Sequence, residues 1–281
     1  MNILARPYLT FIFLNIYYQF TCLPQGLSSA PRIFTRIMRV VMSFLRSKSF
    51  RISAWLDDLL LAASSASLAA SQCHTTLRTL EELGFLPNYE KSVLKPTQKI
   101  SHLGLIWDSV DFIISVPSEK ILDVKSKCLK ALSSRVKVRF LSSILGSIEY
   151  FRWGFPFAAV HYRLLQRFVN DCLSNGLSYD SKVYASHSAR KDLRWWANTD
   201  SSLPPRSLSP FTASLTLYSD ASQDGWGGWT SNEQETSGPW SDVEQSFHIN
   251  YLELKAVFFF LCVFSPVLMT AQSPSELIIL R

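Results

Sequence analysis

The sequence predicts an α+β protein with more than one domain, and three observations support this fold class. Apolar residues recur at helical spacing in three stretches, at residues 31–46, 68–83 and 140–153. Short apolar runs of strand length lie between them, at residues 52–63 and 100–116. Residues 200–214 are rich in serine and contain three prolines, so we expect a linker there.

The chain is expected to begin with strands and to continue into a helix. Residues 7–23 are rich in Tyr, Phe, Ile and Thr, and Asn15 divides them into two apolar runs, which indicates a hairpin. Ser28 or Ser29 can cap the next helix, with Pro31 in its first turn. The apolar stripe of this helix comprises Ile33, Ile37, Val40, Val41 and Phe44.

The middle of the chain alternates between short strands and helices. Residues 52–63 indicate two short buried strands that meet at Asp57-Asp58, and Gly84 should end the helix over residues 68–83. Ser118 is expected to open a basic helix. Beyond the linker we expect strands at residues 215–218, 226–230 and 276–281 and a helix at residues 247–264.

Composition and cysteine usage indicate a globular intracellular protein. Hydrophobic residues make up 47% and charged residues 18%, and the five cysteines are far apart with no CxxC pair, so we expect the cytoplasm or nucleus rather than secretion. The apolar runs at residues 8–23 and 256–269 could be taken for membrane segments. Polar interruptions in the first and Pro266 in the short second run favour core elements, and we expect no membrane association.

The charge is concentrated in the middle of the chain. Residues 118–195 carry 14 basic and 6 acidic residues, a net charge of +8, whereas residues 1–117 carry +4 and residues 196–281 carry −6. A basic stretch is often only a solvated helix face, and nucleic-acid contact is the alternative. If the contact exists, we expect Lys125, Lys127 and Lys130 to contribute to it, mostly through phosphates.

Asp57 and Asp58 are the first candidate catalytic residues. Adjacent carboxylates between apolar runs lose hydration and repel each other, and a divalent cation offsets that cost. Mg²⁺ (or Mn²⁺) takes carboxylate and phosphate oxygens together, as in two-metal nucleotidyl transfer. In isolation the pair would more often be a solvent-exposed turn, because Asp is a common turn residue.

The surrounding motifs favour the metal site. Residues 23–31, LPQGLSSAP, precede the acidic pair; residues 88–92, NYEKS, and then His102-Leu103-Gly104 follow it. In this order, the four elements resemble the nucleotide-binding loop, metal-binding hairpin, last palm motif and primer-gripping turn of retroelement reverse transcriptases. The resemblance implies that residues 1–117 are a partial palm and residues 118–199 a basic, helical, thumb-like or connection-like segment.

The resemblance assigns roles to individual residues. Gln25 would contact the incoming nucleotide, and Gly26 and Ser28 would let the backbone approach it. Lys91 would lie near the triphosphate, although it could also be an ordinary surface lysine. His102, Leu103 and Gly104 would hold the primer end. The implied partners are an RNA or DNA template–primer and deoxynucleoside triphosphates.

Residues 215–281 resemble the beginning of a ribonuclease-H-like α/β domain. Asp220 follows a strand and precedes a Gly-rich hairpin, and Glu253 lies in the segment NYLELKA, which resembles the first helix of such domains. Both would be metal ligands, although Glu253 alone could be a helix-surface glutamate. The element Asp192-Leu193-Arg194-Trp195-Trp196 before the linker looks most like the DIRS-type retroelements, with the gypsy-type group as the near alternative.

The family pattern also requires carboxylates that this sequence does not provide. A reverse transcriptase palm uses a third metal-binding Asp before the nucleotide loop, and no Asp or Glu precedes Asp57. Ribonuclease H uses further carboxylates after its fourth strand, which residues 276–281 resemble. We therefore expect further polyprotein segments on both sides and little activity from this chain alone. A non-catalytic nucleic-acid-binding remnant is the alternative.

Overall fold

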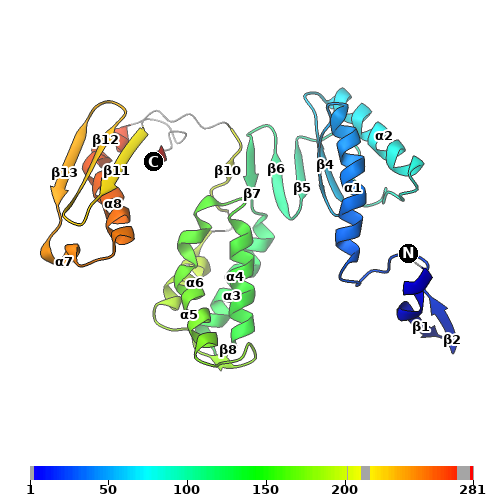
Figure 1. Cartoon of the computed structure of the whole chain (residues 1–281), viewed down its shortest axis with the longest axis horizontal. Coiled ribbons are helices and arrows are strands. Elements are labelled where there is room, and N and C mark those ends of the chain that lie inside the picture. Colours follow the sequence, from blue (N-terminus) through cyan, green and yellow to red (C-terminus); the bar gives the residue numbers. More distant parts are fainter. Residues whose placement is uncertain (1–2, 201, 210–215, 271–278, 281) are drawn as a thin grey trace. The chain divides into compact units, whose positions relative to one another are not determined.

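The computed structural model describes residues 3–200, 202–209, 216–270 and 279–280 (Figure 1). The chain separates into two compact units, Met1–Ser207 and Leu208–Arg281, so the division falls inside the segment expected to be a linker. The last two residues of the first unit, Arg206–Ser207, form β10 and pair with β7 (Ile113–Ser115). Part of the expected linker therefore belongs to the sheet of the first unit.

The first unit begins with a hairpin, as the sequence predicted. After η1 (Ile3–Leu9), β1 (Thr10–Phe13) pairs antiparallel with β2 (Ile16–Gln19). Leu14 and Asn15 form the two-residue turn with φ of 50° and 62°, the left-handed conformation that matches the twist of a hairpin. Every residue of both strands is exposed.

A helix–hairpin–helix segment follows. In it, α1 (Ala30–Ser47) and α2 (Ala66–Glu82) pack against the hairpin of β3 (Arg51–Trp55) and β4 (Asp58–Ala62). The Ser65 hydroxyl accepts a hydrogen bond from the Leu68 backbone N–H and caps α2. The shared core consists of Met38, Val41, Met42, Leu45, Ile52 and Leu80.

The buried face of α1 differs from the apolar stripe that marks this helix in the sequence. Of that stripe only Val41 is buried; Ile33 is 41% exposed and Val40 is 72% exposed. Met38, Met42 and Leu45 face the hairpin instead. The helix therefore has two apolar sides, and periodicity alone does not show which side meets the sheet.

The rest of the first unit is a sheet joined to a helical bundle. The sheet has the order β10-β7-β6-β5, with β5 at Lys99–His102 and β6 at Leu105–Asp108. The helices are α3 (Ser118–Ser133), α4 (Val138–Phe151), η2 (Pro156–His161), α5 (Arg163–Ser174) and α6 (Ala189–Asn198). The two-stranded pair β8 (Val136–Lys137) and β9 (Lys182–Val183) lies between them in the chain. Leu105, Ile114 and Val116 share one core with these helices, so packing is continuous across residue 117.

A buried carboxylate connects α5 and α6. Asp192, which is 6% exposed, accepts a hydrogen bond of 2.9 Å from the Leu165 backbone N–H in the first turn of α5. The Trp196 indole donates to the His161 carbonyl at 2.7 Å, and the Trp195 ring stacks on the His161 ring. The Asp192 carboxylate thereby satisfies a backbone N–H that the start of α5 leaves unpaired, and the Trp196 indole gives the His161 carbonyl a partner.

The second unit is a sheet with the order β13-β12-β11-β14 packed against a long helix. β11 (Thr216–Ala221), β12 (Gly225–Thr230) and β13 (Glu235–Pro239) are antiparallel, and β14 (Ile279–Leu280) is parallel to β11. Two helices complete the unit, α7 (Asp242–Gln245) and α8 (Ile249–Thr270). The strands expected near residues 215–218 and 226–230 and the helix expected at residues 247–264 are confirmed. Of the strand expected at residues 276–281, only Ile279–Leu280 lies within the described residues. β13, whose sequence is ETSGP, was not predicted.

The second unit needs a glycine where α8 meets the sheet. A Cβ at Gly228 would overlap the Phe260 ring, and Phe260 is fully buried with Leu217. Among the described residues, no helix is both long and apolar enough to cross a membrane.

Candidate metal and nucleotide site

The acidic pair lies at the tip of the β3–β4 hairpin. Trp55 pairs with Asp58, which leaves Leu56 and Asp57 as a two-residue turn. Leu56 has a φ of 53°, a left-handed conformation that costs roughly 1–2 kcal/mol for a residue with a Cβ. Both Asp57 and Asp58 are exposed. The predicted hairpin is confirmed, and it packs against α1 and α2. Its strands were expected to be buried, but among their residues only Ile52 is buried.

The β5–β6 turn lies near this tip. Burial lowers the pKa of His102, and the negative charge of Asp58 opposes that effect, so the imidazole lies within electrostatic range of the carboxylate. Leu103 and Gly104 form the turn with φ of 48° and 71°. The structure thus brings the metal-binding and primer-gripping candidates into one region, although Asp58 and His102 are 44 positions apart in the chain.

Two residues that the motifs did not single out surround Gly104. A Cβ at Gly104 would overlap the Lys120 ammonium, which lies 5.0 Å from the centre of the Tyr150 ring. Lys120 comes from α3 and Tyr150 from α4. The turn therefore requires glycine both for its positive φ and for the close approach of Lys120.

The nucleotide-binding candidates lie in loops. Gly26 has a φ of 87°, and Gln25 beside it is exposed. The Asn88 side chain accepts a 3.1 Å hydrogen bond from the Lys91 backbone N–H, which folds NYEKS into a compact turn with the Lys91 side chain exposed. No contact in the described part of the chain joins Gln25 or Lys91 to Asp57, so their shared role stays a prediction.

Asp57 and Asp58 provide two hard carboxylate oxygen donors, which suits Mg²⁺ held together with phosphate and water. Neither forms an ion pair with another described residue. Within the described residues, no group of three or more His, Cys, Asp or Glu gathers as a metal site. The donors present therefore fit one incomplete Mg²⁺ shell rather than a full two-metal centre.

In the second unit, Asp220 and Glu253 occupy neighbouring elements. Asp220 lies on β11 opposite Gly227, and Glu253 lies on α8, which packs against β11. Both side chains are exposed. The Lys255 ammonium binds Glu244, and Glu244 also forms a capping box with Ser241; together these contacts lower the pKa of Glu244 to about 2.

The three lysines predicted to contact nucleic acid already have partners within the first unit. Lys125 donates to the Thr199 carbonyl at 3.1 Å, and Lys127 pairs with Asp123 at 2.5 Å. The Lys130 ammonium lies 5.4 Å from the centre of the Phe140 ring. The contacts of Lys127 and Lys130 are with residues close in the chain, whereas Lys125 bonds a part-buried carbonyl 74 positions away. Lys127 and Lys130 can therefore exchange their partners for a phosphate more easily than Lys125 can.

Comparison with known proteins agrees with this geometry. Residues 2–107 match the family "Reverse transcriptase (RNA-dependent DNA polymerase)". Over residues 2–107 this chain is therefore similar to reverse transcriptases. The reverse transcriptase family is a family of enzymes, and the matched range contains the LPQG loop, the Asp57-Asp58 hairpin, NYEKS and the β5–β6 turn.

The polyproteins of several viruses are similar to this chain. It is 25% identical over 251 residues to the enzymatic polyprotein of Figwort mosaic virus, covering 86% of this chain and 35% of that protein. It is 36% identical over 89 residues to the Gag-Pol polyprotein of Rous sarcoma virus, covering 31% of this chain and 5% of that protein. The chain thus spans about a third or less of these relatives.

Solved structures show the same fold. The foamy viral protease-reverse transcriptase dRH in complex with double-stranded DNA matches 100% of this chain and 46% of its own, with a TM-score of 0.61 and 16% identity. The foamy viral protease-reverse transcriptase with an RNA/DNA hybrid matches 97% of this chain and 35% of its own, with a TM-score of 0.56 and 16% identity. The DIRS-type assignment stays a prediction.

Proposed function

We propose that this chain is the part of an RNA-directed DNA polymerase that holds the incoming nucleotide and the primer end. The observation that carries the proposal is the exposed Asp57-Asp58 tip beside His102, within the segment that matches the family. Residues 1–117 would act as the partial palm and residues 118–199 as the thumb or connection. RNA and DNA template–primers and deoxynucleoside triphosphates are the proposed partners.

The proposed chemistry is metal-assisted nucleotidyl transfer. Bound Mg²⁺ would neutralise phosphate charge and orient the triphosphate for in-line attack. Asp57 and Asp58 would hold the ion, while Gln25, Gly26 and Lys91 would position the nucleotide. His102, Leu103 and Gly104 would position the primer end, with Lys120 and Tyr150 supporting the turn.

Residues 215–281 are proposed to begin a ribonuclease H domain, with Asp220 and Glu253 as two of its metal ligands. The strand order, in which β14 joins β11 in parallel after α8, is consistent with this proposal. Two carboxylates provide only part of the shell that two ions need. We therefore propose that neither activity reaches a useful rate in this chain without carboxylates from additional sequence.

A non-catalytic nucleic-acid-binding remnant is the second candidate. It is favoured by the lack of any three-residue metal group among the described residues. Both candidates predict binding to nucleic acid, so binding alone does not separate them. Only the first predicts that Asp57 matters once the missing elements are supplied.

Primer extension with Mg²⁺ distinguishes the two candidates. Two proteins are compared: this chain, and the same chain lengthened at both ends with the corresponding elements of a related polyprotein. We expect extension only by the lengthened protein and its loss in Asp57→Asn. Removing one such ligand commonly slows transfer by orders of magnitude, about 10²-fold or more. No extension by the lengthened protein would favour the remnant, whereas extension that persists in Asp57→Asn would contradict the role of Asp57 as a metal ligand.

Binding to the basic segment is tested by salt titration. A Lys127→Ala, Lys130→Ala protein should bind a template–primer with a lower salt slope, by up to about 2 units, because two phosphate contacts are lost. Lys125→Ala is the comparison, since its contact with Thr199 makes it partly structural. Unchanged slopes would mean that this surface is only solvated.

A further inference from the structure

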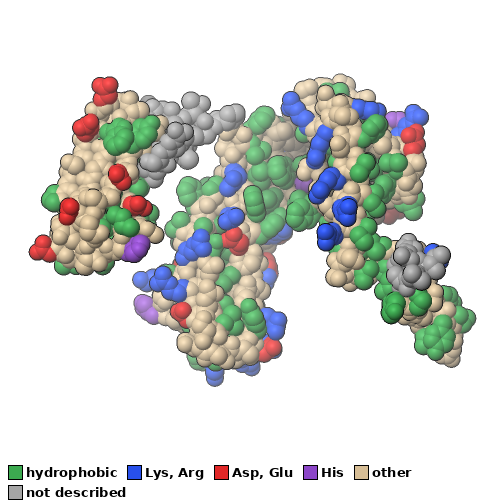
Figure 2. All heavy atoms as spheres, in the orientation of Figure 1, with side chains coloured by type: hydrophobic (Ala, Val, Ile, Leu, Met, Phe, Trp, Pro, Cys, Tyr) green, Lys and Arg blue, Asp and Glu red, His purple; other side chains and the backbone are tan. Residues whose placement is uncertain are grey.

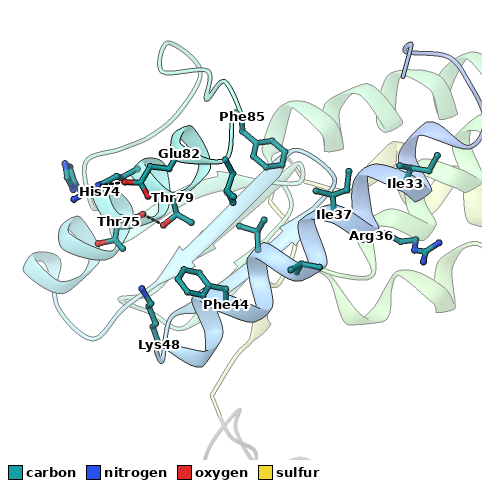
Figure 3. A pocket seen from close by; sticks show the side chains of 14 residues that line it. Ile33, Arg36, Ile37, Phe44, Lys48, His74, Thr75, Thr79, Glu82 and Phe85 are labelled. Atoms are coloured by element: carbon teal, nitrogen blue, oxygen red, sulfur yellow. Dashed lines mark hydrogen bonds and ion pairs between the residues drawn. The ribbon is translucent and has the colours of Figure 1, made fainter. Parts of the chain in front are cut away.

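The outer side of α1 forms an apolar groove that the polymerase proposal does not use. Ile33, Ile37, Val40 and Phe44 are all exposed and line a cavity of about 1260 Å³ between α1 and α2. Phe85 closes the far wall (Figure 3). Exposed apolar surface of this extent on a folded unit commonly marks an interaction site.

The spacing of the exposed residues fits a helix as the occupant. Ile33, Ile37, Val40 and Phe44 are separated by four, three and four residues, the spacing at which one helix packs along another. They extend over about three turns, or roughly 16 Å. A helix of about 12–18 residues would cover them, as in helix-in-groove recognition.

The charge around the groove selects an acidic helix. The rim carries Arg36, Lys48 and Arg78, and its acid Glu82 is paired with Arg78 at 2.8 Å. Lys48 lies over the Phe44 ring at 4.3 Å, so a cation stands directly at the end of the apolar stripe.

The cationic surface continues along the helix beyond the rim. Arg32, Arg36 and Arg39 line a second hollow on α1, and Figure 2 shows Lys and Arg side chains in a column along this helix. The helix contains no Asp or Glu, and these three arginines form no ion pair with the described residues. The same face of a second copy would be equally cationic, and like charges oppose such pairing.

We propose that the α1–α2 groove binds an amphipathic acidic helix of a partner protein. Its apolar side would cover the Ile33–Phe44 stripe, and its Asp or Glu residues would meet Arg36 and Lys48. The proposal does not depend on metal binding or on polymerase activity.

The probe is a fluorescein-labelled 18-residue helical peptide with Leu at heptad spacing and Glu at the flanking positions. Its control has Lys in place of every Glu. By fluorescence anisotropy at low salt, the whole chain should bind the Glu peptide at least about tenfold more tightly than the Lys peptide. The double variant Arg36→Glu, Lys48→Glu should reduce or reverse the preference for the Glu peptide over the Lys peptide.

Two matched valine variants test the apolar contact. Val40→Gln should weaken binding of the Glu peptide at least about fivefold, because Val40 lies at the centre of the stripe. Val110→Gln is the control, because Val110 is exposed to a similar extent, 63% compared with 72% for Val40. Val110 lies in a turn of the same unit, away from the groove. Far-UV circular dichroism verifies that both variants are folded.

Four results would overturn the proposal. Equal affinities for the Glu and Lys peptides would show that charge does not select the partner. Equal losses of affinity in Val40→Gln and Val110→Gln would show that the peptide does not bind in the groove. A dimer that dissociates in Val40→Gln would make a second copy the occupant. A single-stranded oligonucleotide that displaces the Glu peptide, and still binds Val40→Gln at full strength, would reassign the surface to nucleic acid.

Discussion

Replacing Asp192 with Ala should destabilise the first unit measurably. Asp192 is buried and accepts the Leu165 backbone N–H at 2.9 Å, in the first turn of α5. Removal of the carboxylate leaves that buried donor without a partner. A hydrogen bond to a charged group contributes about 1.5–3 kcal/mol, and an unsatisfied buried donor costs a similar amount. We expect the free energy of unfolding to fall by about 2 kcal/mol.

The assay is thermal unfolding of the whole chain followed by circular dichroism at 222 nm. For a unit of about 200 residues, 2 kcal/mol corresponds to a Tm roughly 4–8 °C lower. Asp192→Asn keeps an acceptor oxygen, so its free energy of unfolding should fall by less than that of Asp192→Ala.

Asp171→Ala is the matched control, because Asp171 is exposed on α5 and should change the free energy of unfolding by less than about 0.5 kcal/mol. If Asp192→Ala melts like Asp171→Ala, the buried cap does not hold α5 and α6 together.

Three further predictions concern single residues of the first unit. Burial raises the pKa of the Cys128 thiol to about 12, so at pH 8 a maleimide should modify exposed Cys22 but leave Cys128 unmodified until the protein unfolds; rapid labelling of Cys128 under native conditions would contradict this. Gly104→Ala should lower the free energy of unfolding by about 1–2 kcal/mol, because its φ is 71° and the Lys120 ammonium occupies the Cβ position; a melting curve that matches the parent protein would refute it. Burial lowers the pKa of His161 below 6.5, so its contribution to stability is present above pH 6.5 and is lost as the pH falls towards the lower folded-state pKa. His161→Gln should therefore reduce the fall in Tm between pH 7.5 and pH 5.5. A fall in Tm equal to that of the parent protein would exclude His161 as its cause.

Local sequence signals predicted the elements well where each element carries its own pattern. The β3–β4 hairpin followed from an acidic pair between two apolar runs too short for helices. The first hairpin followed from Asn15 between apolar runs, and Gly84, with a φ of 83°, follows the end of α2 as expected.

Contacts between distant residues had no such signal. Asp192 and Leu165 are 27 residues apart, and Lys125 and Thr199 are 74 apart, so no spacing rule connects them. The proximity of His102 to Asp58 could be expected only from the order of the family's motifs. On α1, helical periodicity identified the helix but not its buried side, because Val40 and Met38 both belong to apolar stripes.

We propose that the Asp57-Asp58 hairpin tip holds a divalent cation in this chain. Fe²⁺ substituted for Mg²⁺, with ascorbate and peroxide, cleaves the backbone beside a bound ion and can be used whether or not the protein is catalytically active. We predict cleavage at residues 56–58 and at the nearby β5–β6 turn, suppressed by excess Mg²⁺ and lost in Asp57→Asn. Cleavage that maps elsewhere, or that persists at the hairpin in Asp57→Asn, would contradict the claim.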